Sequence, residues 1–534
     1  MKLKGAICSI WATLELLLIY LAIKLNMIQN QVSGIFMSKE QHNNSAEVTL
    51  EGDAALDLWL QGKDAWNEWI EKHSISDISF KGVRFSYKSL EGKLSNKRVV
   101  NKDSELDLID FSGFKFHNVT FSGAHFHGKV DFSSAVFQGN TNFNEARFSA
   151  LATFSNSAFE GRSSFEKANF FDKAVFTKVK CESHINFELA SFNGPLDFQE
   201  AQVFGQAVFK SCNFSGHLTL LHSEFHSLFY FAHAHIGGMA IFSRATFSGS
   251  TVFQDSNFKS SSYFSGTSFK HYTDFSASTF QDNVAFENSS FYGEKVSFKK
   301  CQFHATFDFR PEETANLKCL DFEGASFDKQ FTLSGHFNCI PDLRQTKTSH
   351  HIDLSLLTIK LNRHFLKNTG MEATVDQVDA DRLCRLKEIA ESNKNHERAL
   401  AFHADELRAK RWHIFSPWQS ILDGLYSLTS NYGQSIMRPS MYLLASVFIF
   451  ASATLSQTKQ SSYDIAQMKA ALTISVATAT PFLAISKEAR TKSTEELFNK
   501  ELPDNYYLYS YIHSGSSFVF MFLIGLGLRN RFRI

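Results

Sequence analysis

A ladder of large apolar residues runs through the middle of the chain. From Phe132 to Phe291 these residues recur at steps that alternate between five and six, and 26 of the 30 positions are Phe. The pattern therefore repeats every 11 residues. Neither an α-helix, with ~3.6 residues per turn, nor a simple alternating strand produces this period.

A second column, of small residues, accompanies the ladder. Two positions before every second rung stands a small side chain, as at Ala135, Ser157 and Ala245. Residues two apart on an extended segment point to the same face, so each unit sends one large and one small side chain inward. Polar residues and glycine fill the remaining positions, which can face water. Stacked units then give aromatic columns beside columns of small residues.

Units such as TFSNSAF (153–159), SFEKANF (164–170) and IFSRATF (241–247) resemble pentapeptide repeats in their Phe-centred form. The resemblance covers about residues 75–337 and implies a β-solenoid, specifically a right-handed quadrilateral parallel β-helix. Steps of five and six then imply coils of about 22 residues, and eight or nine of them would make a rod ~40 Å long. The expected structural ladder includes Phe132, Phe143, Phe154, Phe165, Phe176, Phe187, Phe198, Phe209, Phe231, Phe242, Phe253, Phe264, Phe275 and Phe286.

The N-terminal part of the chain divides into three segments. An apolar run at 7–23 behind two lysines is just long enough to span a membrane, and a signal peptide has the same features. We interpret 1–27 as an N-terminal membrane anchor or signal-like helix and the polar stretch 28–53 as a linker. Leu and Trp at helical intervals in 54–74 predict an amphipathic helix that caps the open end of the β-helix.

The C-terminal part also divides by composition. The β-helix is expected over 75–345 and a helical connector over 346–438. Within the connector, 381–412 has the composition of an antiparallel helical pair or of one long helix. The final segment, 439–534, is predicted to be a membrane domain.

This membrane domain contains two strongly apolar runs and a weaker one. Met441–Leu455 and 506–528 predict spanning helices, because backbone groups inside a bilayer must bond internally. The stretch between them, 468–486, contains Pro481 and several threonines, which favours a re-entrant helix buried against its neighbours.

The tail resembles the membrane module attached to some bacterial pentapeptide-repeat proteins, through NYGQSIMRPS (431–440) and GLGLRNRFRI (525–534). That module is similar to a two-helix ion channel, with a re-entrant pore-type helix between the two spans. The T-x-G-Y-G filter of potassium channels is absent, and SVATATPF (475–482) stands in its place. This departure puts ion conduction in question. The pore-like segment comprises Thr478, Thr480, Pro481 and Phe482.

Charge argues against nucleic acid as a partner. Lys and Arg total 54, as do Asp and Glu, so the formal net charge is zero. Residues 111–309 contain 16 acidic and 15 basic side chains, whereas a protein that mimics DNA needs a strongly negative face. Phenylalanine accounts for 56 of the 534 residues, an amount of aromatic surface that excludes disorder for most of the chain.

Residues capable of catalysis or metal binding form no recognisable constellation. Five histidines between His217 and His235 are expected on different sides of the rod, and the seven cysteines form no C-x-x-C pair. Cys181, Cys212 and Cys301 occupy inward positions. Motifs for nucleotide binding, nucleophilic catalysis and zinc proteases are lacking. We therefore predict no enzyme activity, no catalytic residue, no metal and no cofactor.

These features lead to three functional hypotheses. The first is a membrane-anchored scaffold that binds an unknown protein partner through its rod. The alternative is an ion-channel-like membrane protein that the rod regulates, and a gyrase-binding DNA mimic is less favoured. Membrane lipids are expected partners, and homo-oligomers are compatible with the channel-like module.

We expect a multi-pass protein of the bacterial inner membrane, and positive charge near Arg438 and Arg529 favours a cytoplasmic β-helix. The β-helix is then cytoplasmic if 468–486 is re-entrant, and periplasmic if all three C-terminal segments cross.

Overall fold

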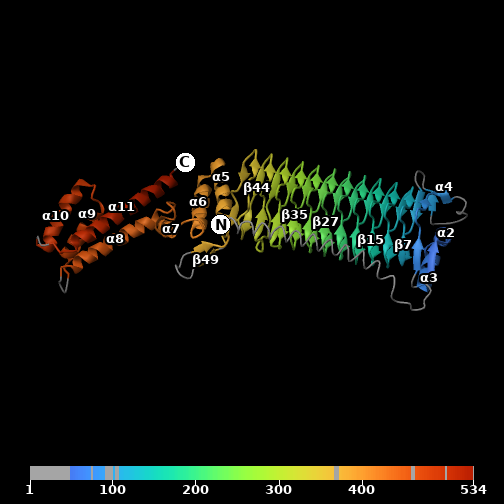
Figure 1. Ribbon diagram of the computed structural model, residues 1–534, viewed down its shortest axis with the longest axis horizontal. Helices are drawn as coiled ribbons and strands as arrows, with labels where there is room; N and C mark the ends of the chain where they lie inside the picture. The colour runs from blue at the N-terminus through green and yellow to red at the C-terminus, as the bar shows by residue number, and fades with distance from the viewer. Residues whose placement is uncertain are drawn as a thin grey trace.

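The structure is a computed structural model that describes most of the chain. The described residues are 48–73, 76–90, 100–102, 107–361, 363–365, 372–458, 463–499 and 502–532. A long β-solenoid occupies one end of the molecule and a group of helices the other, and the two follow each other along one axis (Figure 1). The predicted membrane anchor at 7–23 lies outside the described residues.

Four stacks of short strands form the walls of the solenoid, with 12, 9, 12 and 13 strands among the described residues. One wall consists of β1 (Val48–Glu51), β2 (Ser76–Ser79), β7 (Asn118–Thr120), β11 (Thr141–Asn142), β15 (Ser163–Ser164), β19 (Ile185–Asn186), β23 (Ala207–Val208), β27 (Phe229–Tyr230), β31 (Thr251–Val252), β35 (Thr273–Asp274), β39 (Lys295–Ser297) and β42 (Cys319–Asp321). The other walls run from β3 (Arg84–Phe85) to β46 (Lys347–Thr348), from β4 (Val100–Lys102) to β47 (Ile352–Asp353), and from β6 (Lys115–Phe116) to β38 (Ser290–Phe291).

The register of these walls confirms the predicted coil. In one wall, Val136 and Phe137 pair in parallel with Ala158 and Phe159, 22 residues further along the chain. The described part of the chain makes about 11 turns, more than the eight or nine expected, because the solenoid extends beyond the Phe-rich stretch at both ends. The β-solenoid fold predicted from the sequence is therefore confirmed.

Phenylalanine rings fill the interior in continuous stacks. None of the fourteen predicted rungs is more than 1% exposed. Phe253 and Phe275, one coil apart, stack with ring centroids 4.7 Å apart and an interplanar angle of 2°. Within the coil, Phe253 meets Phe264 edge-on at 5.7 Å. Both geometries are favourable for aromatic pairs, so each ring adds specific contacts to the area that it buries.

Tight turns with a left-handed residue recur every 11 residues along the ladder. At most of them, the N–H of the small residue donates to the rung carbonyl three positions earlier, as from Ala135 to Phe132 at 3.1 Å. The residue before the small one has a positive φ, close to 57° at Ser134. Most of these residues are not glycine, although this conformation favours glycine. Glycine is instead required at other corners, such as Gly161. A Cβ added there would lie 2.3 Å from the backbone of Gly139 in the preceding coil.

The column of small residues also carries hydrogen bonds between coils. Ser278 donates to the carbonyl of Phe253 at 2.7 Å, and Ser256 donates to that of Phe231 at 2.8 Å. Cys301 makes the equivalent contact to Phe275. The sequence analysis attributed this column to the small size of its residues. In the structure their hydroxyl and thiol groups also donate hydrogen bonds to backbone carbonyls buried in the core.

The N-terminal end of the solenoid differs from the prediction in two details. Residues 48–51 form β1, so the predicted linker ends earlier than 53. The predicted helix at 54–74 is two helices, α2 (Gly52–Trp59) and α3 (Lys63–Lys72), because Gly62 between them adopts a φ of 97°.

Two tryptophans of these helices close the end of the aromatic core. Trp59 stacks on Phe111, with centroids 5.0 Å apart, and Trp66 stacks on Phe80 at 5.9 Å. Their indole N–H groups donate to backbone carbonyls of the first coils, at 3.1 and 2.7 Å. The last short helix at this end is α4 (Tyr87–Leu90).

The solenoid continues past its predicted limit at 345. After β44 (Phe331–Leu333) and β45 (Gly335–Phe337), the wall strands β46 and β47 are followed by β48 (Leu357–Ile359). Buried leucine and isoleucine replace phenylalanine in this part, so the sequence signal fades while the coil persists. An antiparallel hairpin of β49 (Arg363–Phe365) and β50 (Glu372–Thr374) comes next.

Seven helices follow among the described residues. They are α5 (Asp379–Ser392), α6 (His396–Lys410), α7 (Pro417–Ser430), α8 (Met437–Ser456), α9 (Ile465–Ala479), α10 (Ala484–Phe498) and α11 (Tyr506–Arg531). The first two form a helical pair against the end of the solenoid, which decides between the two predicted arrangements. The long helices α8 and α11 lie side by side, and α9 and α10 flank their far half (Figure 1).

Candidate functional site at the junction with the helices

Ion pairs attach the α5–α6 pair to the last coils of the solenoid. Arg382 of α5 contacts Asp342 of the solenoid at 3.2 Å and Asp379 of its own helix at 2.9 Å. Burial by itself would raise the pKa of Asp342, but the hydrogen bond from Arg344 and the charge of Arg382 hold it below the ordinary value. A charged Asp342 therefore stabilises this contact at neutral pH.

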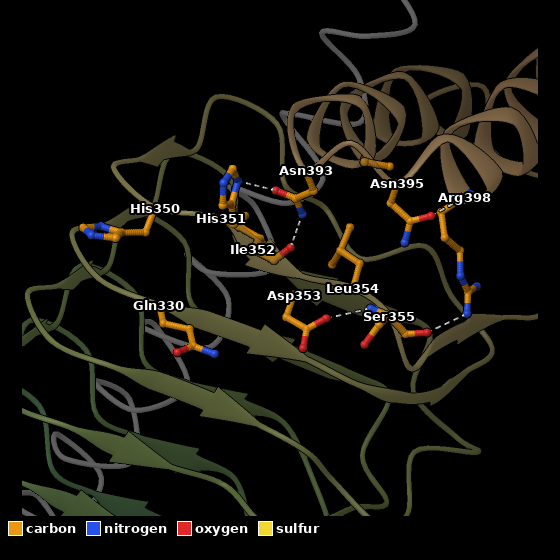
Figure 2. Close-up of a pocket in the computed structure, with 11 residues that line it drawn as sticks. Gln330, His350, His351, Ile352, Asp353, Leu354, Ser355, Asn393, Asn395 and Arg398 are labelled. Atoms are coloured by element: carbon orange, nitrogen blue, oxygen red, sulfur yellow. Dashed lines mark hydrogen bonds between the residues drawn. The ribbon is translucent and has the colours of Figure 1, made fainter. Parts of the chain in front are cut away.

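A pocket of 450 Å³ lies where the final coil meets the two helices (Figure 2). Its polar side chains mainly join the two parts. His351 contacts the side-chain oxygen of Asn393 at 2.8 Å, and Asn393 donates to the carbonyl of Ile352. Arg398 donates to the carbonyl of Ser355 at 2.8 Å. The pocket is thus built of groups that bind one another across the junction.

A buried carboxylate holds α5 against α6. Glu406 of α6 contacts Lys387 of α5 at 2.8 Å and also Lys410. Burial alone would raise the pKa of Glu406, but contacts from His403, Lys387 and Lys410 outweigh burial and hold it well below the ordinary range. The helical pair is therefore stabilised by a charge that is present at neutral pH.

The connection from α7 to α8 is a sharp corner. Asn431, Tyr432 and Gly433 all have positive φ, at 50°, 56° and 74°. Beneath this corner Arg411 forms a buried ion pair with Asp423 at 2.7 Å, and each of them also contacts the Tyr432 hydroxyl. Burial, with the charge of Asp423, raises the pKa of Tyr432 to about 12, so its hydroxyl stays a neutral donor.

The corner docks on the C-terminal end of α11. The side chain of Asn530 donates to the carbonyl of Gly433 at 3.1 Å. A Cβ added at Gly433 would lie 2.9 Å from Leu526, and one added at Gly527 would lie 3.0 Å from Ile436. The segments 431–440 and 525–534 therefore meet at this corner. They are the two motifs that resembled a membrane module, and they lie about 90 residues apart in the sequence.

The helical bundle has small and polar residues inside it. Ser475 of α9 donates to the carbonyl of Val447 in α8 at 2.7 Å and contacts His513 of α11 at 3.3 Å. His513 also stacks on Phe450 with centroids 4.5 Å apart. The other buried residues of α9 include Ala470, Ala471, Ala477, Thr478 and Ala479.

Large apolar side chains lie on the outside of the same bundle. In α8 the side chains of Met441, Phe448 and Ile449 are more than half exposed, and so are those of Phe518 and Phe522 in α11. Two helices of the described chain, Met437–Ser456 and Tyr506–Arg531, are long and apolar enough to cross a membrane, judged by length and composition alone.

The predicted pore-like residues lie at the end of α9. Thr478 is buried, and the Thr480 hydroxyl contacts that of Ser486 at 3.1 Å. Pro481 and Phe482 are exposed in the turn that follows. The chain then continues as α10, a helix the sequence analysis did not predict. No extended row of carbonyls of the potassium-channel type is therefore formed between α9 and α10.

The histidines and cysteines singled out in the sequence are dispersed. His226 stacks on Phe204, with centroids 4.6 Å apart, and His233 lies 3.9 Å from Asp255 on another part of the surface. Among the described residues, no group of three or more potential metal ligands comes together. Cys181 is buried in the core, and burial raises the pKa of its thiol.

Sequence analysis missed the residues of the junction. Arg411, Asp423 and Tyr432 are separated in the sequence and become neighbours only when α7 folds back. A local signal for α7 does exist, because Ser416 and Gln419 flank Pro417 in a capping box at its start. Asn and Gly in NYG likewise mark a helix end.

Comparison with known protein families supports the identity of the solenoid. The family described as Pentapeptide repeats (9 copies) matches residues 111–157, 121–169 and 231–279. No curated protein and no solved structure matches the chain. The matched stretches are coils in which phenylalanine rungs stack at 22-residue spacing. The solenoid of this chain is therefore a pentapeptide-repeat β-helix, and the matched repeats belong to that family.

Proposed function

We propose that this protein is a membrane-anchored scaffold, in which α8 and α11 cross a membrane and carry the β-helical rod. The observation that carries the proposal is the reversed packing of the bundle. Ser475, Ser517 and Gly527 are buried beside a few apolar residues such as Phe450, while Phe448 and Phe518 are exposed. Small and polar residues between helices with large apolar residues outside are typical of helices surrounded by lipid.

The two helices support a topology in which the rod is cytoplasmic. The N-terminal end of α8 and the C-terminal end of α11 both lie at the junction with the solenoid (Figure 1). Arg438, Arg529 and Arg531 are all exposed at this end of the bundle. Positive residues mark the cytoplasmic ends of spanning helices. The helix α9 enters the bundle from the far side and is only 15 residues long, too short to cross. The two crossings are then α8 and α11, and both of their arginine-bearing ends lie on the cytoplasmic side.

The rod supplies a long surface for a protein partner. Pentapeptide-repeat solenoids are generally structural or binding proteins. One wall of this rod exposes Phe204, with Lys180 at 5.6 Å from its ring centroid and His226 stacked on it. An exposed aromatic ring bordered by polar groups is suited to protein contact. The balanced charge of the rod fits a protein better than nucleic acid.

The ion-channel-like alternative receives less support. A re-entrant helix is compatible with α9, but the segment that would form a filter is a turn followed by α10. This helix exposes Lys487, Arg490 and Lys492. The scaffold hypothesis needs no conducting path, so we retain it as the proposed function.

Membrane fractionation with alkaline extraction tests the anchoring. The full chain is expected to remain in the membrane pellet, whereas alkali should release a chain lacking 1–27 and 437–534. Reporter fusions at residues 340 and 534 should both report the cytoplasmic side. Release of the full chain by alkali would contradict the spanning role of α8 and α11.

Photo-crosslinkers placed around one coil test the binding role. Partner binding predicts a discrete product from position 204 and none from position 215, which is exposed on the opposite wall of the same coil. Equal products from both positions, or from neither, would count against a specific binding face.

A further inference from the structure

The helix α7 is amphipathic, but its apolar face points outward and its polar face inward, the opposite of a helix at the surface of a soluble protein. Its outer face carries Trp418, Leu422 and Leu425, which are 74%, 61% and 51% exposed. Ile421 and Leu428 lie on the same side and are also exposed. These positions recur at intervals of three and four, so they form one continuous apolar stripe along the helix.

The polar face of α7 is directed into the protein. Ser420 is fully buried and accepts the backbone N–H of Trp412 at 3.1 Å. Ser430 is also fully buried and accepts the N–H of Gly433 at 3.1 Å. The only charged residue of the helix, Asp423, forms the buried ion pair under the corner. The polar contacts of α7 therefore fix the direction in which its apolar stripe points.

The stripe continues onto the surface of the proposed membrane bundle. After the corner, α8 begins with Met437 and Met441, which are 73% and 60% exposed. Arg438 lies between them, and Arg529 and Arg531 end α11 at the same end of the bundle. An apolar stripe bordered by cations matches the boundary between acyl chains and anionic headgroups.

We propose that α7 lies in the surface of a lipid bilayer that contains anionic lipids, with Trp418, Leu422 and Leu425 inserted among the acyl chains. This deepens the proposed function, on which it rests, because α8 and α11 are taken as the spanning helices. α7 then connects the membrane surface to the rod through the Arg411–Asp423 pair and α6. Tryptophan is the residue expected at such an interface.

Quenching of Trp418 by brominated lipid tests this placement. The full chain and Trp418→Phe are reconstituted in vesicles of phosphatidylethanolamine and phosphatidylglycerol, brominated either near the headgroups or near the chain ends. The difference in emission between the two proteins isolates Trp418. We expect strong quenching by the shallow bromine and weaker quenching by the deep bromine.

Charge variants on α7 provide the matched comparison. Leu422→Glu together with Leu425→Glu should remove most of the quenching, because carboxylates resist insertion among acyl chains. Gln419→Glu adds a carboxylate to the same helix while keeping the capping box with Ser416, and it should leave the quenching unchanged. Circular dichroism of each variant verifies that the solenoid is folded.

The outcomes separate this inference from the proposed function. If neither brominated lipid quenches Trp418 while the chain resists alkaline extraction, α8 and α11 still span the membrane and the placement of α7 is overturned. If its emission instead follows the protein-to-lipid ratio without bromine dependence, the stripe contacts a second copy of the chain, which also overturns it. Extraction of the chain by alkali would refute the proposed spans themselves, whereas retained bromine quenching in that case would still support α7 as a lipid-binding helix.

Discussion

The solenoid and the C-terminal bundle use phenylalanine in opposite ways. In the solenoid Phe253 and Phe275 are fully buried, whereas in the bundle Phe448 and Phe518 are more than half exposed. Small and polar residues such as Ser475 fill many buried positions of the bundle, beside a few aromatic ones such as Phe450. Most phenylalanines thus face inward in the solenoid, whereas several in the bundle face outward, which is the behaviour expected if water surrounds the first and lipid the second.

Truncation of a phenylalanine in each region should give the largest contrast. Phe253→Ala removes a ring that stacks on Phe275, and we expect a loss of ~3–5 kcal/mol in the unfolding free energy of the solenoid. Phe518→Ala on the outside of α11 should leave this value within ~0.5 kcal/mol. Thermal denaturation monitored by circular dichroism measures both. Similar losses from the two variants would break the comparison.

The ion pair under the corner determines how firmly the two regions are joined. Arg411→Met leaves the Asp423 carboxylate buried without its partner, which should cost about 3 kcal/mol locally. The expected result is proteolytic cleavage between α6 and α8 while the melting of the solenoid is unchanged. Combining it with Asp423→Leu removes both charges and should restore most of the protection. Loss of solenoid stability in the single variant would show that the two regions unfold as one unit.

Overpacking should distinguish inward from outward positions of the solenoid. Ala245 is buried in the small-residue column, and Ala245→Phe is expected to destabilise the coil by ~1–3 kcal/mol. The adjacent Arg244 lies at an exposed corner, so Arg244→Ala should change little. Denaturant unfolding of the two variants makes the comparison. Equal effects would mean that the inward and outward assignment is wrong.

Acid should loosen the α5–α6 pair before it affects the aromatic core. The pKa of Glu406 is lowered in the folded protein, so the folded state binds its proton less readily than the unfolded state. Its stabilising contribution is therefore present above the ordinary pKa, near 4.3, and is lost as pH falls below that value. The protection of α5 and α6 amides, measured as the exchange rate relative to the intrinsic rate at each pH, should decrease over this window. Glu406→Gln should weaken the pH dependence, and an unchanged profile would exclude Glu406 as its source.

Most of the solenoid could be predicted because its signal is local and repeated. The five-residue step from Phe132 to Phe137 recurs in every coil, and each repetition strengthens the prediction of a β-solenoid. The prediction failed at the ends, where β1 extends the first wall and Leu357 lies in a coil without phenylalanine. Capping helices and terminal coils have sequences unlike the repeat, because they meet something other than another coil.

The helical module was less predictable for a physical reason. Runs of apolar residues indicated α8 and α11, but α7 and α10 contain mixed residues whose orientation depends on their neighbours. Nothing in PWQSILDGLYSLTS indicates that Ser420 is buried and Trp418 exposed; the reverse would suit a soluble helix equally well. The pairing of Arg411 with Asp423 settles the orientation, and it requires the fold of the whole junction.

The sequence alone determined that a coil of about 22 residues with stacked aromatic rungs exists, because the contacts that stabilise each coil repeat at a fixed chain distance. It also determined that two C-terminal segments are apolar enough to cross a membrane. Tertiary structure decided which faces of the helices point outward and that Gly433 meets Asn530 at the junction. Those features depend on single contacts between segments far apart in the sequence. No repeated sequence pattern indicates such contacts, because the segments become neighbours only in the folded chain.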